Sequence, residues 1–396
     1  MYQSKMRNVV VVGIGQTVFG KFLDRSVRSL AEEALKLAVE DAGIDYGQIG
    51  ITYFANALSG LITGQETIRG QVALRHTPVM GRPIFNVDNA CASGSSAFHL
   101  AWLSVASEQV DVALAIGAEK LTHVEKAVTF GAYASGVDVG ERNEMMRAAP
   151  NDHSIFMDIY AGKSRKYMAA SGATPEDFAL VTVKSRQGAS LNPWAQFRRE
   201  TTVEEVLGSR MISEPLTLPM CSPIADGAAA AVLMSESMAK RLGLRPVYVR
   251  ASTLVSANGD GAAPICAVRA AQGAYANAGV GPQDIHVAEV HDASAPAEIM
   301  LYEHLGFASR NHGIDLVRQG VTSIGGRLPV NPGGGLLSRG HPVGATGIAQ
   351  IIELTMQLRG TAEGRQREGA KLALAECSGG QIGADSATAA VTILSA

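Results

Sequence analysis

Cys91 lies in a segment whose residue types suit nucleophilic catalysis. The apolar residues before Asn86 predict a strand that ends in a polar turn, and the small residues from Gly94 to Ala97 predict a tightly packed helix behind Cys91. A cysteine at such a turn faces the unpaired N–H groups and positive end of the helix, which favour thiolate over thiol. The same N–H groups could hold a developing oxyanion. A buried packing cysteine remains the alternative, because free cysteine is often fully buried.

The C-terminal half carries three groups that could act together with Cys91. His291 and Cys377 each lie at the end of a predicted strand, and His341 lies in a glycine-rich segment over 331–347. Glycines let the backbone approach a ligand closely. A single histidine in a loop is usually structural. Two cysteines and two histidines at strand ends or beside glycines favour an active site.

Composition and charge restrict the class of protein. At 396 residues the chain exceeds the size at which one hydrophobic core stops growing, so we expect two or more domains. The net charge of −3 argues against nucleic-acid binding. The four cysteines show no C-x-x-C spacing, so no metal site and no disulfide framework is expected. No apolar run is long enough for a membrane span or a signal peptide, so we expect a cytoplasmic enzyme.

Alternating strands and helices at both ends of the chain predict an α/β protein. The predicted strands share apolar runs and cover 8–14, 49–57, 110–117, 225–235, 246–255, 285–290 and 371–375. The predicted helices cover 26–42, 164–171 and 175–191, and another begins near Val343. Between 121 and 219 the alternation is lost and charged residues become common, which predicts a lid that carries substrate contacts.

The second half of the chain repeats the first. Ala42-Gly43-Ile44 reappears as Ala278-Gly279-Val280, and the segment over 91–94 has its counterpart over 341–344. Such a repeat predicts two similar βαβ-rich halves whose matching loops converge on one site. Cys91 and His341 occupy equivalent positions in this repeat, so we expect them to face each other.

Four motifs make the sequence resemble the thiolase superfamily. They are NACASGSSA around Cys91, HDAS from His291, GHPVGATG from Gly340 and CSGG from Cys377. With NPWAQFR and SPIADGAAAAVLMSE, they resemble most the sterol-carrier-protein-type, lipid-transfer-like branch, which also contains acetyl-CoA acetyltransferases. The resemblance covers essentially the whole chain. It implies an α/β thiolase fold, in which duplicated βαβ-rich halves form five αβαβα layers with an inserted lid.

The resemblance also implies a domain organisation and partners. We expect an N-terminal thiolase half over 1–120 and 220–245, a lid over 121–219 and a C-terminal half over 246–396. Proteins of this kind form homodimers or dimers of dimers. Some members of this branch need a small OB-fold/zinc-ribbon partner subunit.

A role for each reactive residue follows from the same resemblance. Cys91 would attack a 3-ketoacyl-CoA or acyl-CoA and form an acyl-cysteine, while His341 takes its proton. Cys377 would move the α-proton in condensation or protonate the leaving carbanion in cleavage. The backbone N–H groups of Cys91 and Gly379 would form one oxyanion hole, and His341 with a water positioned by His291 the other. Coenzyme A would be a substrate and no cofactor would stay bound.

The sequence departs from the usual family pattern at two positions. Ser294 stands where an aromatic wall is usual, which suggests a wider pocket for a bulky, branched or aromatic acyl group, and Gln381 alters the usual C-x-G-G-G loop. The function expected is degradation of acyl-CoA in lipid metabolism, as in β-oxidation, or the reverse Claisen condensation. Candidates for binding the phosphates of CoA are the cations near the lid, namely Lys163, Lys166, Arg186, Arg198 and Arg199.

Two other functions remain open. One is a retro-aldolase of the thiolase fold that acts on a 3-hydroxyacyl-CoA, although such relatives usually lack the nucleophilic cysteine. Retention of Cys91 and Cys377 argues against it. The other is a lipid-binding subunit that depends on a partner for activity.

Overall fold

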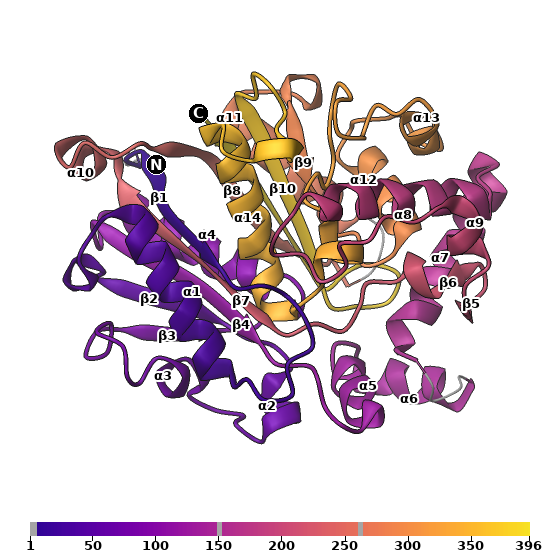
Figure 1. Cartoon of the computed structure of the whole chain (residues 1–396), viewed down its shortest axis with the longest axis horizontal. Coiled ribbons are helices and arrows are strands. Elements are labelled where there is room, and N and C mark those ends of the chain that lie inside the picture. Colours follow the sequence, from indigo (N-terminus) through magenta and orange to yellow (C-terminus); the bar gives the residue numbers. More distant parts are fainter. Residues whose placement is uncertain (1–5, 149–152, 260–263) are drawn as a thin grey trace.

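The computed structural model describes residues 6–148, 153–259 and 264–396 (Figure 1). The N-terminal half contains β1 (Val9–Gln16), α1 (Val27–Ala42), β2 (Ile51–Ala55), α2 (Ser59–Thr63), α3 (Arg69–Ala73), β3 (Ile84–Val87), α4 (Ser93–Ala106), β4 (Val112–Glu119), β7 (Gly227–Ser235) and α10 (Glu236–Arg241). Local chemistry sets the helix ends. In α1, Ser26 Oγ accepts the N–H of Ser29, and Gly43 ends the helix with φ +63°.

The C-terminal half repeats this arrangement. It contains β8 (Val247–Ser256), α11 (Cys266–Ala278), β9 (Val287–Glu289), α12 (Ala295–His304), α13 (Gly313–Arg318), α14 (Val343–Arg359), β10 (Leu372–Gly379) and β11 (Thr388–Ser395). β2 pairs with β4 in parallel as β9 does with β10, while β4–β7 and β10–β11 are antiparallel. Cys91 precedes α4 and His341 precedes α14, so the predicted equivalence of these two positions is confirmed.

The segment between β4 and β7 is mainly helical. It contains α5 (Lys126–Ala134), α6 (Val139–Ala148), α7 (Ile155–Ser171), α8 (Pro175–Ser190), α9 (Val203–Leu207), β5 (Met211–Ser213) and β6 (Leu216–Thr217). α7 begins nine residues before the helix expected from residue 164. Ser154 caps it by accepting the N–H of Phe156, and the apolar residues that follow extend it.

Nine strands form one hydrogen-bonded sheet, in the order β3-β2-β4-β7-β1-β8-β11-β10-β9. The junction between the halves is thin, because β1 and β8 pair only at Val10–Tyr248 and Val11–Val247. The half-sheets therefore diverge from this junction, and α4 and α14 pack between them (Figure 1). α1 covers the outer face of the first half-sheet and α11 that of the second. The expected five αβαβα layers are present, joined through this junction.

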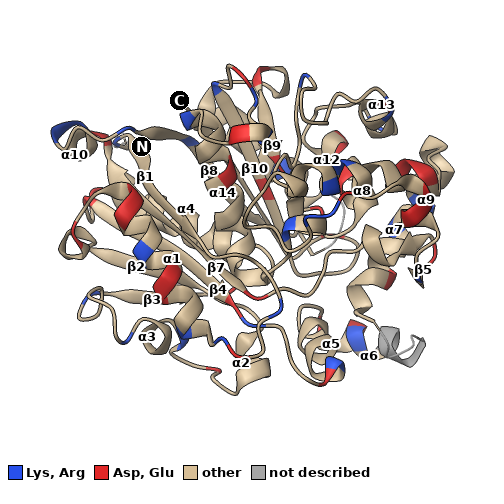
Figure 2. Cartoon of the chain, in the orientation of Figure 1, with Lys and Arg blue, Asp and Glu red and all other residues tan. Residues whose placement is uncertain are grey.

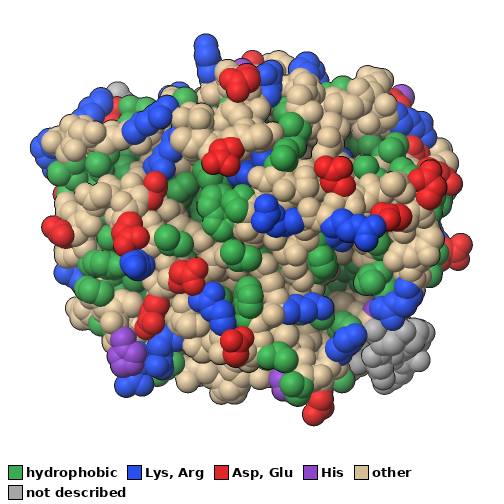
Figure 3. Space-filling view, viewed as in Figure 1, with side chains coloured by type: hydrophobic (Ala, Val, Ile, Leu, Met, Phe, Trp, Pro, Cys, Tyr) green, Lys and Arg blue, Asp and Glu red, His purple; other side chains and the backbone are tan. Residues whose placement is uncertain are grey.

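Side chains along each strand point alternately into the central and the outer apolar core, and this alternation lets helices pack on both faces of the sheet. In β4, Ala113 and Ala115 belong to the central apolar core around α4 and α14, while Leu114 and Ile116 belong to the outer core under α1. Successive strand side chains point to opposite faces, so a strand covered on both sides must be apolar throughout. Figure 2 accordingly shows most charged residues on outer helices and connections. Among the described residues on the face in Figure 3, acidic and basic side chains are interspersed.

The two central helices approach so closely that their contact requires glycine. A Cβ at Gly347 of α14 would lie 2.4 Å from the backbone nitrogen of Ser95 in α4. A Cβ at Gly94 would lie 2.9 Å from the carbonyl oxygen of Gly344. These contacts hold the first turns of the two helices, and the residues that precede them, side by side.

Gly347→Ala should therefore destabilise the protein, because the added methyl group must push α14 away from α4. Overpacking of this kind costs about 1–3 kcal/mol, so we expect a lower melting temperature. Gly131→Ala in α5 is the matched control, because its Cβ would meet nothing within 4 Å. A Gly347→Ala protein that melts like the unmodified chain would show that the helices can separate without cost.

Candidate active site

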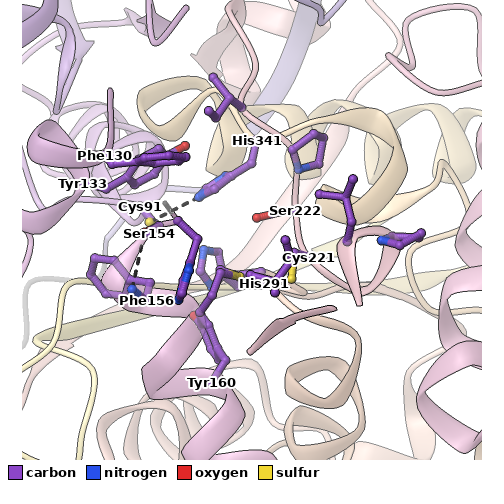
Figure 4. Close-up of a pocket in the computed structure, with 18 of the residues that line it drawn as sticks. Cys91, Phe130, Tyr133, Ser154, Phe156, Tyr160, Cys221, Ser222, His291 and His341 are labelled. Atoms are coloured by element: carbon purple, nitrogen blue, oxygen red, sulfur yellow. Dashed lines mark hydrogen bonds between the residues drawn. The ribbon is translucent and has the colours of Figure 1, made fainter. Parts of the chain in front are cut away.

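Cys91 and His341 meet between the first turns of α4 and α14. His341 Nε2 lies 3.3 Å from Cys91 Sγ (Figure 4). Ala90 adopts a left-handed φ of +49° directly before Cys91, and the N–H of Ala92 bonds to the carbonyl of Asn89. This tight turn brings the sulfur to the end of the helix that faces His341.

Thr346 determines which nitrogen of His341 carries the proton. Its hydroxyl lies 3.0 Å from the carbonyl of Pro342, to which it donates, and 2.7 Å from His341 Nδ1. The hydroxyl hydrogen is used by that carbonyl, so the oxygen accepts the Nδ1–H. Nε2 is left with its lone pair directed at the thiol of Cys91, as a general base requires. Thr346 was not among the residues expected from the sequence, although it lies within the GHPVGATG motif.

Cys377 completes the reactive group from the other half of the fold. Its Sγ is buried at the end of β10 and lies 3.2 Å from the carbonyl oxygen of Cys91. A Cβ at Gly379 would lie 2.2 Å from the carbonyl oxygen of Asn89 and 3.0 Å from the backbone nitrogen of Cys91. Only glycine allows the end of β10 to lie this close to the turn, and the backbones of Cys91 and Gly379 are therefore neighbours.

His291 enters the site from the segment after β9. Its ring lies edge-on to that of His341, with 5.3 Å between centroids, and its backbone N–H bonds to Glu376 Oε2 at 3.1 Å. The ring is 5% exposed, and its Nε2 has no hydrogen-bond partner among the described residues. Asp292 points elsewhere, since its carboxylate accepts the N–H groups of Leu336 and Leu337.

Burial keeps the reactive groups uncharged. Burial and the nearby Glu119 carboxylate raise the pKa of Cys91 to about 12, and burial raises the pKa of Cys377 well above its usual value. Burial lowers the pKa of His291 to about 4 and that of His341 well below its usual value. The expectation of a resting thiolate at Cys91 is therefore wrong. The loss of solvation outweighs the favourable end of α4.

A cavity of about 460 Å³ opens onto these groups. Cys91, His291, His341 and Gly379 line it. Its other lining residues are mostly apolar and aromatic and come largely from the segment between β4 and β7, and Figure 4 shows Phe130, Tyr133, Phe156 and Tyr160 around the reactive groups. Met157, Phe197, Ile212 and Leu218 also line the cavity. The segment between β4 and β7, expected to be a lid, thus contributes most of the wall beside the reactive groups.

Four cations also line this cavity, Lys21, Lys126, Arg186 and Arg210. None forms an ion pair within the described ranges, and Arg186 stacks on Phe197 with its Cζ 4.2 Å from the ring centroid. Of the five cations singled out from the sequence, Arg186 alone lines this cavity. Lys21, Lys126 and Arg210 were missed, because nothing near them in the sequence distinguishes them from surface cations.

The other four candidate cations lie elsewhere. Lys163 and Lys166 line a second cavity beside α11 and α12, and Lys163 Nζ lies 3.2 Å from Gln381 Oε1. Arg198 is exposed and lines neither of these cavities. Arg199 is 83% exposed and pairs with Glu205 at 2.6 Å.

Ser294 does not line the cavity, contrary to the expectation that it widens the acyl pocket. It is fully buried directly before α12 and pairs with Cys221 in an isolated bridge. The segment over 291–294 alternates, so His291 and Ala293 line the cavity whereas Asp292 and Ser294 do not.

The fold and the site together define a class of protein, a duplicated α/β enzyme with a cysteine and a histidine that meet at equivalent helix N-termini. Comparison with known families gives the particular family. The model of the thiolase N-terminal domain matches residues 9–237, and that of the thiolase C-terminal domain-like family matches residues 250–396. The chain therefore belongs to the thiolase family and has the thiolase fold. It is an acyltransferase of this family.

Named relatives agree with the branch expected from the sequence. An acetyl-CoA acetyltransferase of Methanothermobacter thermautotrophicus is 39% identical, over 98% of this chain and 100% of that protein. The benzoylsuccinyl-CoA thiolase subunit BbsB of Thauera aromatica is 36% identical, over 94% of this chain and 95% of BbsB. Sterol carrier protein 2 of Bos taurus is also 36% identical, over 94% of this chain and 70% of that protein.

A solved structure titled Ltp2-ChsH2(DUF35) aldolase is similar as well. It superposes with a TM-score of 0.79 and 27% sequence identity, covering 98% of both chains. Among the described residues, no helix is long and apolar enough to cross a membrane.

Replacement of Thr346 by valine should impair His341 without removing it. Loss of a buried hydrogen bond costs about 1–3 kcal/mol, so we expect acylation of Cys91 to slow by roughly 5- to 100-fold. Thr346→Ser keeps the hydroxyl and should stay close to the unmodified rate. Equal rates for the serine and valine variants in stopped-flow acylation would exclude the proposed control of the tautomer.

The raised pKa of Cys91 predicts how its alkylation depends on pH. The thiol stays protonated well above neutrality, so the thiolate fraction should grow roughly tenfold per pH unit from about pH 7 to about pH 9. Iodoacetamide labelling of Cys91, followed by mass spectrometry, should accelerate in parallel. Cys91→Ser gives the background from Cys221, which lines the same cavity. A rate that is constant across this range would indicate a preformed thiolate instead.

Proposed function

We propose that the chain is a CoA-dependent thiolase that works through an acyl-cysteine on Cys91. It cleaves a 3-ketoacyl-CoA with CoA, or catalyses the reverse Claisen condensation. The observation that carries this proposal is the meeting of three groups, of which Cys91 and His341 line the same cavity and Cys377 lies buried beside Cys91. His341 Nε2 is 3.3 Å from Cys91 Sγ, and Cys377 Sγ is 3.2 Å from the Cys91 carbonyl oxygen.

In cleavage, the Cys91 thiol gives its proton to His341 Nε2 as its sulfur attacks the 3-keto carbon. The backbone N–H groups of Cys91 and Gly379 stabilise the oxyanion that forms. The bond between C2 and C3 then breaks, leaving the acyl group on sulfur and an enolate of acetyl-CoA. Cys377 donates its thiol proton to C2, a role supported by a raised pKa that keeps this thiol protonated.

The enolate oxygen is stabilised by His341 and by a water held by His291. The unpartnered Nε2 of His291 supports this role, since a buried ring nitrogen without a partner is costly. A second CoA thiol then gives its proton to the Cys377 thiolate and attacks the acyl-cysteine. The acyl-CoA leaves, and Cys91 recovers its proton from His341. Coenzyme A enters and leaves as a substrate.

The walls of the cavity support the choice of substrate. Four unpaired cations, Lys21, Lys126, Arg186 and Arg210, suit the pyrophosphate and 3′-phosphate of CoA. The aromatic lining suits a bulky, branched or aromatic acyl group. The name of the relative BbsB, a benzoylsuccinyl-CoA thiolase subunit, agrees with an aromatic substrate.

The retro-aldolase is the second candidate, favoured by the similarity to the structure titled an aldolase. The retained thiols support the thiolase over it, with Cys91 Sγ 3.3 Å from His341 Nε2 and Cys377 Sγ 3.2 Å from the carbonyl oxygen of Cys91. The same title names a second component, and BbsB is named a subunit, so we include a small OB-fold/zinc-ribbon partner in the proposal.

We also propose a homodimer, or a dimer of such dimers. β3 is the outermost strand of the sheet, and Phe85 on it is 50% exposed while stacked on Tyr53. An exposed edge strand with an apolar side chain is a natural site for pairing with a second copy.

Intact-mass spectrometry after brief exposure to a panel of 3-ketoacyl-CoAs tests the function. We expect a mass gain equal to one acyl group. The fraction of the chain that is acylated should be larger with aromatic and branched substrates than with acetoacetyl-CoA. Cys91→Ala should show no gain. Cys221→Ser, which changes a thiol in the same cavity outside the reactive group, should behave like the unmodified chain.

Two outcomes would contradict the proposal. No adduct with any substrate, even after addition of candidate partner subunits, would favour the aldolase or a binding subunit. A clear preference for acetoacetyl-CoA over every bulky substrate would refute the assignment of the acyl group.

A further inference from the structure

Cys91, His291 and His341 form a cluster of potential metal ligands. One donor atom from each, the cysteine Sγ and a nitrogen of each ring, lies within 4.8 Å of the others. The three residues come from segments about 200 and 50 residues apart in the chain, so no spacing in the sequence reveals the cluster. This explains why the cysteine spacing predicted no metal site.

His291 gives a second, independent indication of a ligand. It is 5% exposed, and its Nε2 has no protein partner among the described residues. A buried nitrogen left without a partner costs free energy, which a bound ligand would recover. The ring lies edge-on to His341 and beside the cavity (Figure 4).

The donor set is suited to zinc. One thiolate and two neutral imidazoles with a fourth open position are typical of Zn²⁺, whereas Mg²⁺ and Ca²⁺ prefer oxygen ligands. Tetrahedral Zn²⁺ requires donor atoms about 3.3–3.6 Å apart, given Zn–S and Zn–N bonds of about 2.3 and 2.0–2.1 Å. A sulfur and a nitrogen lie at the upper end of this range, about 3.5–3.6 Å apart. His341 Nε2 and Cys91 Sγ, at 3.3 Å, need to move apart only slightly to reach it. Rotation of the His291 side chain would bring its ring nitrogen to the same distance from the other two donor atoms. The fourth coordination position of the metal then faces the cavity.

We propose that this cluster binds one Zn²⁺ ion reversibly and that the ion inhibits the enzyme. Binding replaces the thiol proton of Cys91 with a sulfur–metal bond and releases that proton, with no change in oxidation state. The sulfur lone pair and the base on His341 are then both occupied, so Cys91 cannot attack a substrate. A metal here blocks acylation rather than assisting it, and acylation of Cys91 excludes the metal.

Cobalt(II) is the probe of choice, because its spectrum reports the ligands without any turnover. The chelator-treated chain should bind one equivalent of Co²⁺, with a thiolate-to-cobalt charge-transfer band and the visible bands of a tetrahedral site. Cys91→Ser should lose the charge-transfer band. His291→Gln should weaken Co²⁺ binding at least roughly 10- to 100-fold. That is the loss seen when a residue hydrogen-bonded to a metal ligand is replaced, and His291 would be a ligand itself.

Cys221→Ser is the matched control, because this thiol lines the same cavity but lies outside the cluster. It should keep the full spectrum, and circular dichroism should show that every variant is folded. Zn²⁺ should displace Co²⁺ and slow iodoacetamide labelling of Cys91 until a chelator is added.

A charge-transfer band that survives in Cys91→Ser, or one that disappears in Cys221→Ser, would overturn the assignment. Absence of any tetrahedral Co²⁺ spectrum in the unmodified chain would overturn it too. None of these results depends on thiolase turnover, so failure of the metal site and failure of the proposed function can be told apart.

Discussion

The contact between α4 and α14 is the constraint on which the rest of the site depends. Each helix belongs to one half of the duplicated fold, and Gly94 and Gly347 let their backbones touch. Glu119, at the end of β4, ties the start of α14 to the segment after β2, because its buried carboxylate accepts the N–H of Gly344 at 2.8 Å and that of Ala57 at 3.0 Å. Two helix N-termini are thereby held together, and the residues before them, Cys91 and His341, must meet.

Burial then determines the charge of the groups that meet. A thiol beside a neutral imidazole needs no counter-ion, so the site can be dry without an unpaired charge. In the proposed mechanism the pair stays neutral until the sulfur attacks a substrate carbonyl, and the proton then moves to His341. Nearby buried charges have partners instead. Arg339 pairs with Glu289 at 2.8 Å and ties the segment before His341 to the strand before His291.

Under the proposed function, the groups that react and the walls that contact the substrate come from different parts of the chain. The reactive groups come from the two repeated halves, where packed strands and helices hold them rigidly. The aromatic wall and three of the four cations near it come from the segment inserted between β4 and β7, with Lys126 and Phe197 as examples. Under the proposed function, changes in this insertion would alter the acyl group accepted while the distance between Cys91 and His341 stays fixed.

The sequence by itself determined the family, the duplicated α/β fold and the meeting of Cys91 with His341, because strand alternation and motifs are local patterns that burial enforces. The domain boundaries drawn from it stay a prediction. Only the tertiary structure decided the charge of Cys91, since desolvation depends on what covers it. It also decided that Ser294 faces away from the cavity and that Lys21 and Arg210 line it. These properties depend on side-chain direction and on contacts between distant segments, which composition and spacing do not encode.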